Sequence, residues 1–388
     1  MNLPSIQSAL KDLKLDAWLF ADFRGRDTIA YGVLGLPETM TTRRWYYLIP
    51  AQGEPLKLNH RIEPGKLDSL PGQKRIYSRW EELHAGLREM VAPHRRVAMQ
   101  YSPLNNIPYV SLADAGTVEL IRSFGVEVVS SADLVQIFQA RWGPGDLEAH
   151  LEAGQIVDQI RADAFAEVAR LIRKDGATDE YTIAKFILDR YKDAGLDTHD
   201  TPIIGSNQNS GDPHYEPAPG RSAPIRPGDF VLMDMWAKKP GRVYYDITWT
   251  GFVGAQPPEK VQRIFEIVRD ARDCAVHFVQ DAVKAGRLIH GWQVDDAARG
   301  HITKHGFGEY FVHRTGHSIA QEIHANGANM DNLETRDERS IVAGTCFSVE
   351  PGIYLPEFGV RSEVNVYVDE KEARVTGAIQ TELIRIEV

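Results

Sequence analysis

Residues 228–250 read GDFVLMDMWAKKPGRVYYDITWT, two apolar runs joined by a turn that contains Pro240 and Gly241. Runs of aromatic and β-branched residues on either side of such a turn predict a β-hairpin. Each run contains one acid, Asp234 in the first and Asp246 in the second. An unpaired buried carboxylate is costly, so an acid inside a strand normally faces solvent, joins a salt bridge or binds a cation.

The same arrangement returns in residues 344–368, GTCFSVEPGIYLPEFGVRSEVNVYV. In both stretches a glycine is followed six residues later by an acid, and a second acid stands beyond a loop that contains Pro and Gly. The acids of the later stretch are Glu350 and Glu363. Facing carboxylates on one side of a hairpin lie about 5 Å apart and repel unless a cation or a shared proton intervenes. The repetition favours a duplicated fold with a cation site over two solvent-facing surfaces.

Helical patterns precede both stretches in the same order. A long amphipathic helix is predicted from about residue 147, with apolar residues at three- and four-residue spacing, and a second helix around residues 181–195. The same two patterns recur at 257–286 and 292–306. Each half therefore reads as two helices followed by paired strands.

The first part of the chain has a different rhythm. Strand-like runs alternate there with helical segments, which predicts a small α/β domain over residues 1–143. The segment RWGPGD, residues 141–146, interrupts this alternation with two glycines and a proline. The predicted fold class is α+β, with an N-terminal α/β domain and a duplicated C-terminal domain over residues 147–388.

Charge and composition exclude several classes of protein. The formal net charge is −10, and no basic segment suggests a nucleic-acid partner. No window approaches the roughly 20 apolar residues of a membrane span, and charged residues interrupt the N-terminal segment where a signal peptide needs an apolar core. Cys274 and Cys346 are too few for a disulfide framework, so we expect a protein of the reducing cytoplasm.

Three histidines stand in YFVHRTGHSIAQEIHA, residues 310–325. His313 and His317 are four residues apart and share a face in either a helix or a strand. His324 follows His317 by seven residues and reaches the same side only if the chain turns around residues 320–322. A lone histidine is usually a hydrogen-bonded core or surface group. Four matched acids nearby favour His317 as a nitrogen ligand, and four carboxylates suffice for two divalent ions.

These pieces together resemble the metallopeptidases of the creatinase or pita-bread fold, which include aminopeptidase P, prolidase and methionine aminopeptidase. An ordered five-part pattern carries the resemblance: Asp234, Asp246, His317, Glu350 and Glu363. With DPHYEP around His214, it covers residues 147–388. The first 140 residues resemble the N-terminal domain of the aminopeptidase P and prolidase branch. The resemblance implies a pita-bread catalytic domain of duplicated ααββ units.

The resemblance also implies a site for two divalent metal ions. Asp234 would chelate one ion, and Asp246 and Glu363 would bridge the pair. His317 and Glu350 would complete the coordination of the second ion. An oxygen-rich ligand set with one histidine suits manganese best, with cobalt or zinc as alternatives.

Further roles follow from the same resemblance. Glu350 is expected to carry a proton from water toward the leaving nitrogen, His324 to stabilise the oxyanion and His313 to orient the substrate. His214 matches a histidine that contacts the substrate. Arg361 matches an arginine beside the substrate that holds the acidic ligands in place.

The sequence departs from the family pattern in three places. Asp234 and Asp246 are twelve residues apart, one more than usual, so the hairpin loop is expected to hold an extra residue. Trp249 replaces the usual arginine after DIT, and residues 318–320, SIA, replace a usual glycine. We expect these residues at the pocket wall, where they affect substrate preference rather than metal binding.

The implied activity is hydrolysis of the Xaa-Pro peptide bond, preferentially in dipeptides. Arg336 stands fourteen residues before Glu350, where prolidases carry the arginine that receives the free carboxylate of a dipeptide. It could equally be a solvated loop arginine paired with Asp337 or Glu338. The alternative activity is that of an Xaa-Pro aminopeptidase on longer peptides.

Two other kinds of protein share this fold, a metal-free hydrolase and a non-catalytic binding protein. Both are less favoured because all five ligands are present here. The expected partner is a small peptide with proline at its second position. The family alone implies a homodimer.

Overall fold

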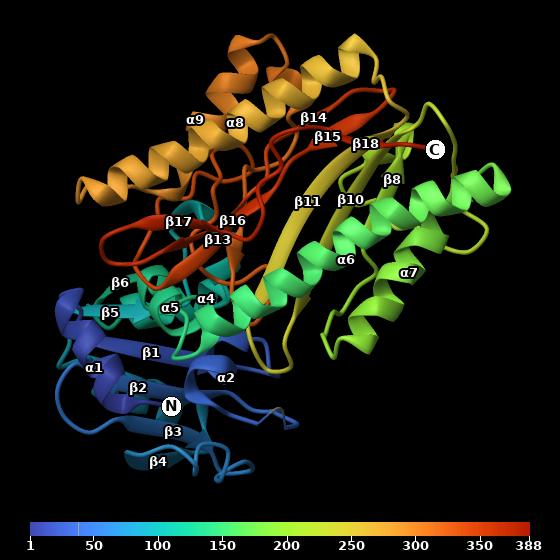
Figure 1. Ribbon diagram of the computed structural model, residues 1–388. Coiled ribbons are helices and arrows are strands. Elements are labelled where there is room, and N and C mark those ends of the chain that lie inside the picture. The colour runs from blue at the N-terminus through green and yellow to red at the C-terminus, as the bar shows by residue number, and fades with distance from the viewer. Residues whose placement is uncertain (38) are drawn as a thin grey trace. The chain divides into compact units, whose positions relative to one another are not determined.

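The computed structural model describes residues 1–37 and 39–388 (Figure 1). It divides into two compact units, Met1–Gln139 and Ala140–Val388. The division falls after Gln139, so that only Ala140 lies between it and the RWGPGD segment. Helices and sheets are mixed in both units, in agreement with the predicted α+β class.

Unit 1 is built on a six-stranded sheet in the order β4-β3-β2-β1-β5-β6. Its strands are β1 Ala17–Asp22, β2 Trp45–Pro50, β3 Leu56–His60, β4 Gln73–Tyr77, β5 Arg96–Met99 and β6 Glu127–Ser130. Its helices are α1 Leu3–Asp12, α2 Thr28–Leu34, α3 Trp80–Val91, α4 Ala115–Arg122 and α5 Ala132–Gln139. Short 3₁₀ turns are η1 Pro103–Asn105 and η2 Pro108–Val110.

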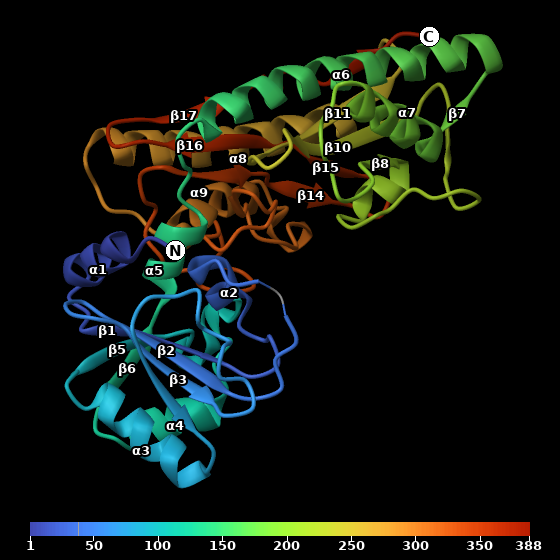
Figure 2. The same ribbon diagram turned by 90° about the horizontal axis from the view of Figure 1, so that it is seen from below.

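Helices cover both faces of this sheet, as Figure 2 shows. Along β1, Trp18 and Phe20 pack with α1, α2 and α5, whereas Ala17 and Leu19 pack with α3 and α4. Successive residues of a strand point to opposite faces, so each strand supplies both cores. The result is a three-layer α/β domain.

Unit 2 contains two helix pairs and two four-stranded sheets. The first half has α6 Asp146–Asp175, β7 Thr178–Asp179, α7 Glu180–Asp193, β8 Ile203–Ser206, η3 Asn207–Gly211, β9 Pro224–Ile225, β10 Phe230–Lys238 and β11 Tyr244–Val253. The second half has α8 Glu259–Lys284, α9 Gly291–Lys304, η4 Gly308–Tyr310, β12 Ser318–Ile319, β13 Thr345–Val349, β14 Gly352–Tyr354, β15 Gly359–Arg361, β16 Val364–Val368, β17 Ala373–Thr376 and β18 Ile384–Ile386. The sheet orders are β18-β11-β10-β8 and β12-β13-β16-β17.

The predicted duplication is present, since each half has two helices followed by paired strands. Figure 1 shows α6 lying along β10 and β11. Gly228 and Gly344, the residues that open the two sequence stretches, have positive φ angles of 94° and 82°. Their N–H groups donate to Val253 and Val368 at 2.7 and 2.8 Å, which closes the open end of each hairpin in the same way. Glycine adopts this left-handed conformation without steric cost.

The hairpin of β10 and β11 has one face toward the helices and one toward the second half. Met233, Met235 and Ile247 pack in the core of α6 and α7. Asp234 and Asp246 alternate with them in sequence and therefore lie on the opposite face. Both acids are buried, so the solvent-facing alternative does not apply.

Trp249 was expected at the pocket wall, and this prediction was wrong. It lies in the core formed with α6 and α7, on the helix side of β11. The Arg161 guanidinium of α6 stands 3.4 Å above its ring centroid. The physical reason is strand alternation, because Trp249 stands three positions after Asp246 in β11 and an odd offset points a side chain to the opposite face.

Two general expectations can be compared with the structure. Cys274 and Cys346 are both free, the first exposed and the second buried. Over the part of the chain that the structure describes, we find no helix with the length and apolar character needed to span a membrane.

Candidate metal centre

The two hairpins meet through a small set of direct hydrogen bonds. The N–H of Glu363 donates to the carbonyl of Thr248 at 3.1 Å. The Asn365 side chain accepts from the N–H of Asp246 at 3.0 Å and donates to its carbonyl at 2.6 Å. These contacts fix the middle of β11 against β16, so the acids of both halves converge.

The acids of the first hairpin share a face but do not stand directly opposite each other. Asp234 pairs with Thr248, and Asp246 pairs with Trp236. The two carboxylates are thus diagonal neighbours, two residues out of register. Thr248 lies on the same face as both acids. It stands opposite Asp234 and two residues after Asp246 along β11.

The ladder of the second hairpin opens where its acids stand. Val349 pairs with Val364, and Gly352 pairs with Arg361 in the same register. Between these pairs, the N–H of Glu350 donates to the Thr315 carbonyl at 2.7 Å, and the N–H of Glu363 turns to the first half. Both acids therefore leave the regular ladder while their backbone groups stay satisfied.

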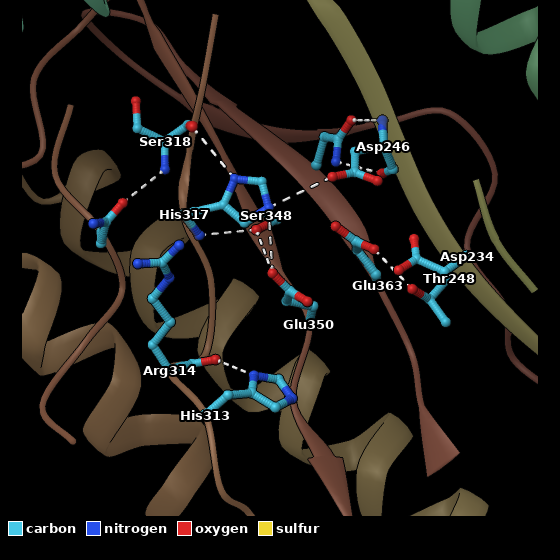
Figure 3. Close-up of polar contacts among 12 residues, drawn as sticks. Asp234, Asp246, Thr248, His313, Arg314, His317, Ser318, Ser348, Glu350 and Glu363 are labelled. Atoms are coloured by element: carbon cyan, nitrogen blue, oxygen red, sulfur yellow. Dashed lines mark hydrogen bonds and ion pairs between the residues drawn. The ribbon is translucent and has the colours of Figure 1, made fainter. Parts of the chain in front are cut away.

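A histidine completes this cluster, as Figure 3 shows. His317 Nε2 lies 3.5 Å from Asp246 Oδ2 and 3.4 Å from Glu350 Oε1. Ligand atoms of Asp246, His317 and Glu363 all lie within 4.8 Å of one another, and all three residues are buried. The donor set of carboxylate oxygens and one imidazole suits a divalent cation.

The backbone around His317 fixes the direction of its ring. Its Nδ1 lies 3.3 Å from the Ser318 carbonyl, which can only accept, so Nδ1 carries the proton and Nε2 faces the acids. The Ser348 hydroxyl accepts from the His317 N–H at 2.9 Å and donates to Glu350 Oε1 at 3.1 Å. Burial lowers the pKa of His317, which favours the neutral form that a metal ligand requires.

Two buried carboxylate oxygens in the cluster lack a partner. Among the residues that the structure describes, Asp246 Oδ1 and Glu363 Oε1 have no hydrogen-bond donor. A buried charged oxygen left unsatisfied is strongly unfavourable. Cations between these two residues would satisfy both atoms, so the donor set fits metal ions in the bridging positions.

Burial shifts the ionisation of the acids in the same direction. It raises the pKa of Asp234 to about 6 and that of Asp246 to about 7. It raises the pKa of Glu350 as well, and that of Glu363 rises well above its usual value through burial and the neighbouring Asp246 carboxylate. Without a cation, part of this cluster is therefore protonated near neutral pH.

Arg361 is the cation that this chain itself supplies to the cluster. It is buried, and its guanidinium donates to Asp234 Oδ2 and to the Thr248 hydroxyl. Its Nε lies 3.8 Å from Glu350 Oε2. Tyr354 and these carboxylates keep the pKa of Arg361 well above its usual value despite burial. The guanidinium therefore holds one acid from each half.

His313 lies outside the acid cluster, in a chain of hydrogen bonds that ends at Arg361. Its Nδ1 donates to the Arg314 carbonyl at 2.7 Å, so its Nε2 accepts from the Tyr354 hydroxyl at 2.6 Å. Arg361 in turn donates to the same hydroxyl at 3.1 Å. Both ring nitrogens of His313 are thus engaged within the protein, and burial lowers its pKa to about 3.

His324 returns to the cluster through the predicted turn. The Ala320 N–H donates to the Glu322 carbonyl at 3.0 Å, and the Ala325 N–H donates back to Ser318 at 2.8 Å. The His324 ring lies 4.3 Å from the His317 ring in an edge-to-face arrangement. Its side chain remains exposed, which leaves it accessible to a ligand.

The remaining predicted residues lie on exposed segments. His214 is exposed, and its N–H donates to Asp212 Oδ1 at 3.0 Å. It is near enough to His324 to contribute to the lowered pKa of that ring, after His317, burial and Arg314. Arg336 is exposed, with its guanidinium 4.4 Å above the Trp292 ring. Its Nε is 3.6 Å from Glu338, one of the two partners expected for a loop arginine.

Among the residues that the structure describes, four side chains that bond to the cluster were not predicted from the sequence. They are Thr248, Ser348, Tyr354 and Asn365. Thr248 donates to Glu363 Oε2 at 2.9 Å. The sequence does contain a signal for Thr248, Ser348 and Asn365. Each stands two residues from one of the acids along the chain, so in a strand its side chain points to the same face as that acid.

A buried, acid-rich centre with one histidine, formed at the junction of a duplicated fold, defines a protein built to hold divalent metal ions. Residues 148–370 match metallopeptidase family M24. This match covers more than half of the chain, so the chain belongs to that family.

Individual relatives are consistent with this assignment. An Xaa-Pro dipeptidase of Lactobacillus delbrueckii subsp. lactis is 31% identical over 205 residues. The match covers 52% of this chain and 51% of the relative, so the chain spans about half of that relative's length.

Solved structures extend the likeness over both units. A dipeptidase PepE from Mycobacterium ulcerans matches with a TM-score of 0.70 and 24% identity over 100% of this chain and 97% of the other. A prolidase from Thermococcus sibiricus matches with a TM-score of 0.64 and 24% identity over 100% and 98%. At this identity the likeness concerns the fold, and it confirms the predicted two-domain pita-bread class.

Proposed function

We propose that this chain is a metal-dependent peptidase that hydrolyses Xaa-Pro bonds, preferentially in dipeptides. One observation carries the proposal. Asp246 and Glu363 each keep one buried oxygen without a donor in the described part of the chain, beside a neutral His317. Family membership and the Xaa-Pro dipeptidase among the relatives supply the reaction and the substrate class.

Five residues would hold two divalent ions: Asp234, Asp246, His317, Glu350 and Glu363. When bound, such a pair of ions polarises the scissile carbonyl and supplies a nucleophilic water near neutral pH. Manganese is the metal we expect, because most of the donors are carboxylate oxygens.

The residues of the chain would move the proton and hold the substrate. Glu350 Oε1 lies 3.4 Å from His317 Nε2 among the proposed metal ligands, and Glu350 would accept a proton from water and pass it to the leaving nitrogen. His324 is exposed beside His317 and would donate to the developing oxyanion. His313 would act through Tyr354 and Arg361, which it orients.

The first experiment removes the metal and returns it. Enzyme stripped with a chelator is titrated with Mn²⁺ while cleavage of Ala-Pro and Ala-Pro-Ala is followed. We expect activity on the dipeptide to return at two ions per chain. A stripped enzyme that retains full activity, or one that binds two ions and cleaves neither peptide, would contradict the proposal.

Glu350→Gln tests the proton transfer. The expected loss in kcat is about 10²-fold or more, with the fold retained, because the amide cannot accept the proton. Glu357→Gln is the matched control, since that glutamate is exposed and pairs with Lys260. Near wild-type turnover in Glu350→Gln would exclude its assigned role.

Whether the substrate is a dipeptide or a longer peptide is a separate question. One observation favours the alternative activity, that of an Xaa-Pro aminopeptidase. Arg336 stacks on Trp292 and pairs with Glu338, so it already has partners of a loop arginine. If it receives the carboxylate of a dipeptide, Arg336→Ala should raise KM for Ala-Pro far more than for Ala-Pro-Ala. Arg287→Ala is the control, because that arginine also stands near an aromatic ring, Phe278. Equal effects on both peptides would favour an Xaa-Pro aminopeptidase.

The proposal includes a cytoplasmic homodimer. The two free cysteines support a reducing compartment, and the dimer is carried over from the resemblance to the aminopeptidase P and prolidase branch. Sedimentation of the purified protein tests the second point, and a monomer at assay concentration would exclude it.

A further inference from the structure

Unit 1 contains a cavity of about 850 Å³ at one edge of its sheet. Phe23 follows β1, His60 ends β3 and Tyr77 ends β4, and all three line it. β2 runs antiparallel to both β1 and β3, and β4 runs parallel to β3, so these residues mark the carboxyl ends of parallel strands. In open α/β sheets, ligands bind at this edge.

Three arginines line this cavity: Arg26, Arg43 and Arg44. Asp114 is the one carboxylate among the described residues that line it. It caps α4 by accepting from the N–H and the hydroxyl of Thr117 at 2.9 and 2.7 Å. In a chain of formal net charge −10, the cavity therefore has a local excess of positive charge.

The segment that carries two of these arginines is held in place by its backbone. Glu63 accepts from the N–H of Thr42 at 2.8 Å and from that of Arg43 at 3.3 Å. The Tyr77 hydroxyl donates to the Arg44 carbonyl at 2.7 Å. Both arginine side chains remain exposed. The polypeptide is thus fixed where the guanidinium groups enter the cavity, which lowers the cost of ordering them around an anion.

Two exposed aromatic side chains form the apolar part of the wall. Trp80, the first residue of α3, is 63% exposed, and Phe23 is 36% exposed. The His84 ring braces Trp80 in an edge-to-face contact at 5.3 Å. Arg26 stands 5.6 Å from the Phe23 ring centroid. Exposed aromatic faces beside arginines suit a ligand that carries both a planar ring and an anionic group.

We propose that this cavity binds a small phosphorylated molecule with a planar ring, as in a nucleoside monophosphate. Arg43 and Arg44 hold the phosphate, because guanidinium groups bind it in bidentate fashion. Trp80 stacks on the ring. This binding site shares no residue with the metal cluster, since all of its residues belong to unit 1 and all of the proposed metal ligands to unit 2.

The test is calorimetric titration of the full-length protein at low salt with adenosine monophosphate, adenosine and inorganic phosphate. We expect the monophosphate to bind tightest, phosphate at least about tenfold more weakly and adenosine not measurably. Arg43→Gln/Arg44→Gln should weaken binding of the monophosphate by about tenfold or more. Trp80→Leu should abolish its advantage over phosphate.

Neighbouring residues provide matched controls. Arg79→Gln and Arg88→Gln remove charge from the adjoining segment outside the cavity lining, and binding should change less than about twofold. Melting temperatures report whether each variant is folded. If the double variant does not fold, Arg26→Gln removes a charge of the same cavity from a different segment.

Several results would overturn the proposal. One is equal binding of the monophosphate by wild type and the arginine variants, and another is binding of phosphate as tight as that of the monophosphate. A third is an absence of binding combined with a change of oligomeric state in the double variant. In that case the arginines would belong to a contact between copies of the chain. None of these results depends on peptidase activity.

Discussion

The Asp246 carboxylate is buried, one of its oxygens has no donor within the described chain, and burial raises its pKa to about 7. In the metal-free protein, the raised pKa of Asp246 contributes stability that is fully present when the pH is below 3.8, the ordinary pKa of an aspartate. That stability is lost as the pH rises to about 7, the pKa of Asp246 in the folded protein. Divalent ions bound at the proposed ligands would remove this penalty by replacing the proton.

Metal-stripped wild type should therefore have a lower melting temperature at pH 8 than at pH 5. Asp246→Asn cannot ionise, so the decrease between these pH values should be smaller in the stripped variant. The same variant should lose metal binding in the presence of Mn²⁺. Asp189→Asn, at an exposed pair with Lys185, is the control. A decrease of equal size in Asp246→Asn and wild type would rule out Asp246 as its source.

The contacts of Arg361 with the acids lead to a second prediction, on metal affinity. Arg361→Gln removes the guanidinium that holds Asp234 and lies close to Glu350. Metal affinity should fall by about 10- to 100-fold, as for other groups that orient metal ligands. Titration with Mn²⁺ measures this, with Arg374→Gln near the Tyr367 ring as a control. An unchanged affinity would mean that the acids hold their positions without the arginine.

At this scale the sequence predicted residue types better than their surroundings. The acids and His317 could be found because carboxylates inside apolar strands are unusual and occur here in a repeated frame. Thr248 and Asn365 are ordinary strand residues, and only their alternation with the acids points to the site. Trp249 was assigned to the wrong face because family position was used in place of that alternation.

Among the elements, α6 is tied to both halves of unit 2 by one buried histidine. His150 Nδ1 donates to the Tyr244 carbonyl at 2.7 Å, and its Nε2 accepts from the Thr376 hydroxyl at 2.6 Å. Protonation of Nε2 would place a positive charge in the buried interior and would require the Thr376 hydroxyl to turn and accept instead of donate. Burial lowers the pKa of His150 to about 4.

A lowered histidine pKa contributes stability that is present above pH 6.5 and is lost as pH falls toward 4. For His150 this loss should amount to about 3 kcal/mol in the free energy of unfolding. His150→Gln should be less stable at pH 7 but should lose less between pH 7 and pH 4.5. Urea unfolding at several pH values measures the difference, and His277→Gln at an exposed position is the control. Identical acid slopes for His150→Gln and wild type would contradict the assignment.

The elements themselves follow from periodicity to different degrees. α6 to α9 were predicted because their apolar stripes repeat at helical spacing over many residues. The register of β10 and β11 was not, since it depends on the conformation of the turn at Pro240 and Gly241. The opening of the second hairpin at Glu350 depends on an acceptor at Thr315, which lies far away in sequence.

On the scale of the whole molecule, the two halves of unit 2 are joined at Asn365. Its side chain satisfies both backbone groups of Asp246, across a separation of 119 residues in sequence. Asn365→Ala would leave a buried N–H and a buried C=O without partners. The free energy of unfolding should fall by about 2–4 kcal/mol, and metal affinity should fall with it.

Urea unfolding and Mn²⁺ titration of the same variant test this prediction. Asn332→Ala is the control, because that side chain donates to Asp296 at an exposed position. A loss of stability without a change in metal affinity would mean that Asn365 stabilises the junction of the two halves but does not fix the positions of the metal ligands.

The duplication was visible in the sequence, but the way in which the halves meet was not. Repeated glycines and acids establish that two similar units exist. The contacts of Asn365 and Thr248 are made between side chains and backbone of different halves, and single-chain periodicity has no signal for them.

The distribution of the proposed ligands over the two halves would also set an order of events during folding. Asp234 and Asp246 come from the first half, whereas His317, Glu350 and Glu363 come from the second. A cation can meet the whole set only after the halves have docked, so its capture follows the slowest long-range step. At saturating metal, uptake during refolding would then proceed at a rate independent of metal concentration, which makes the ion a natural probe of the moment when the two halves come together.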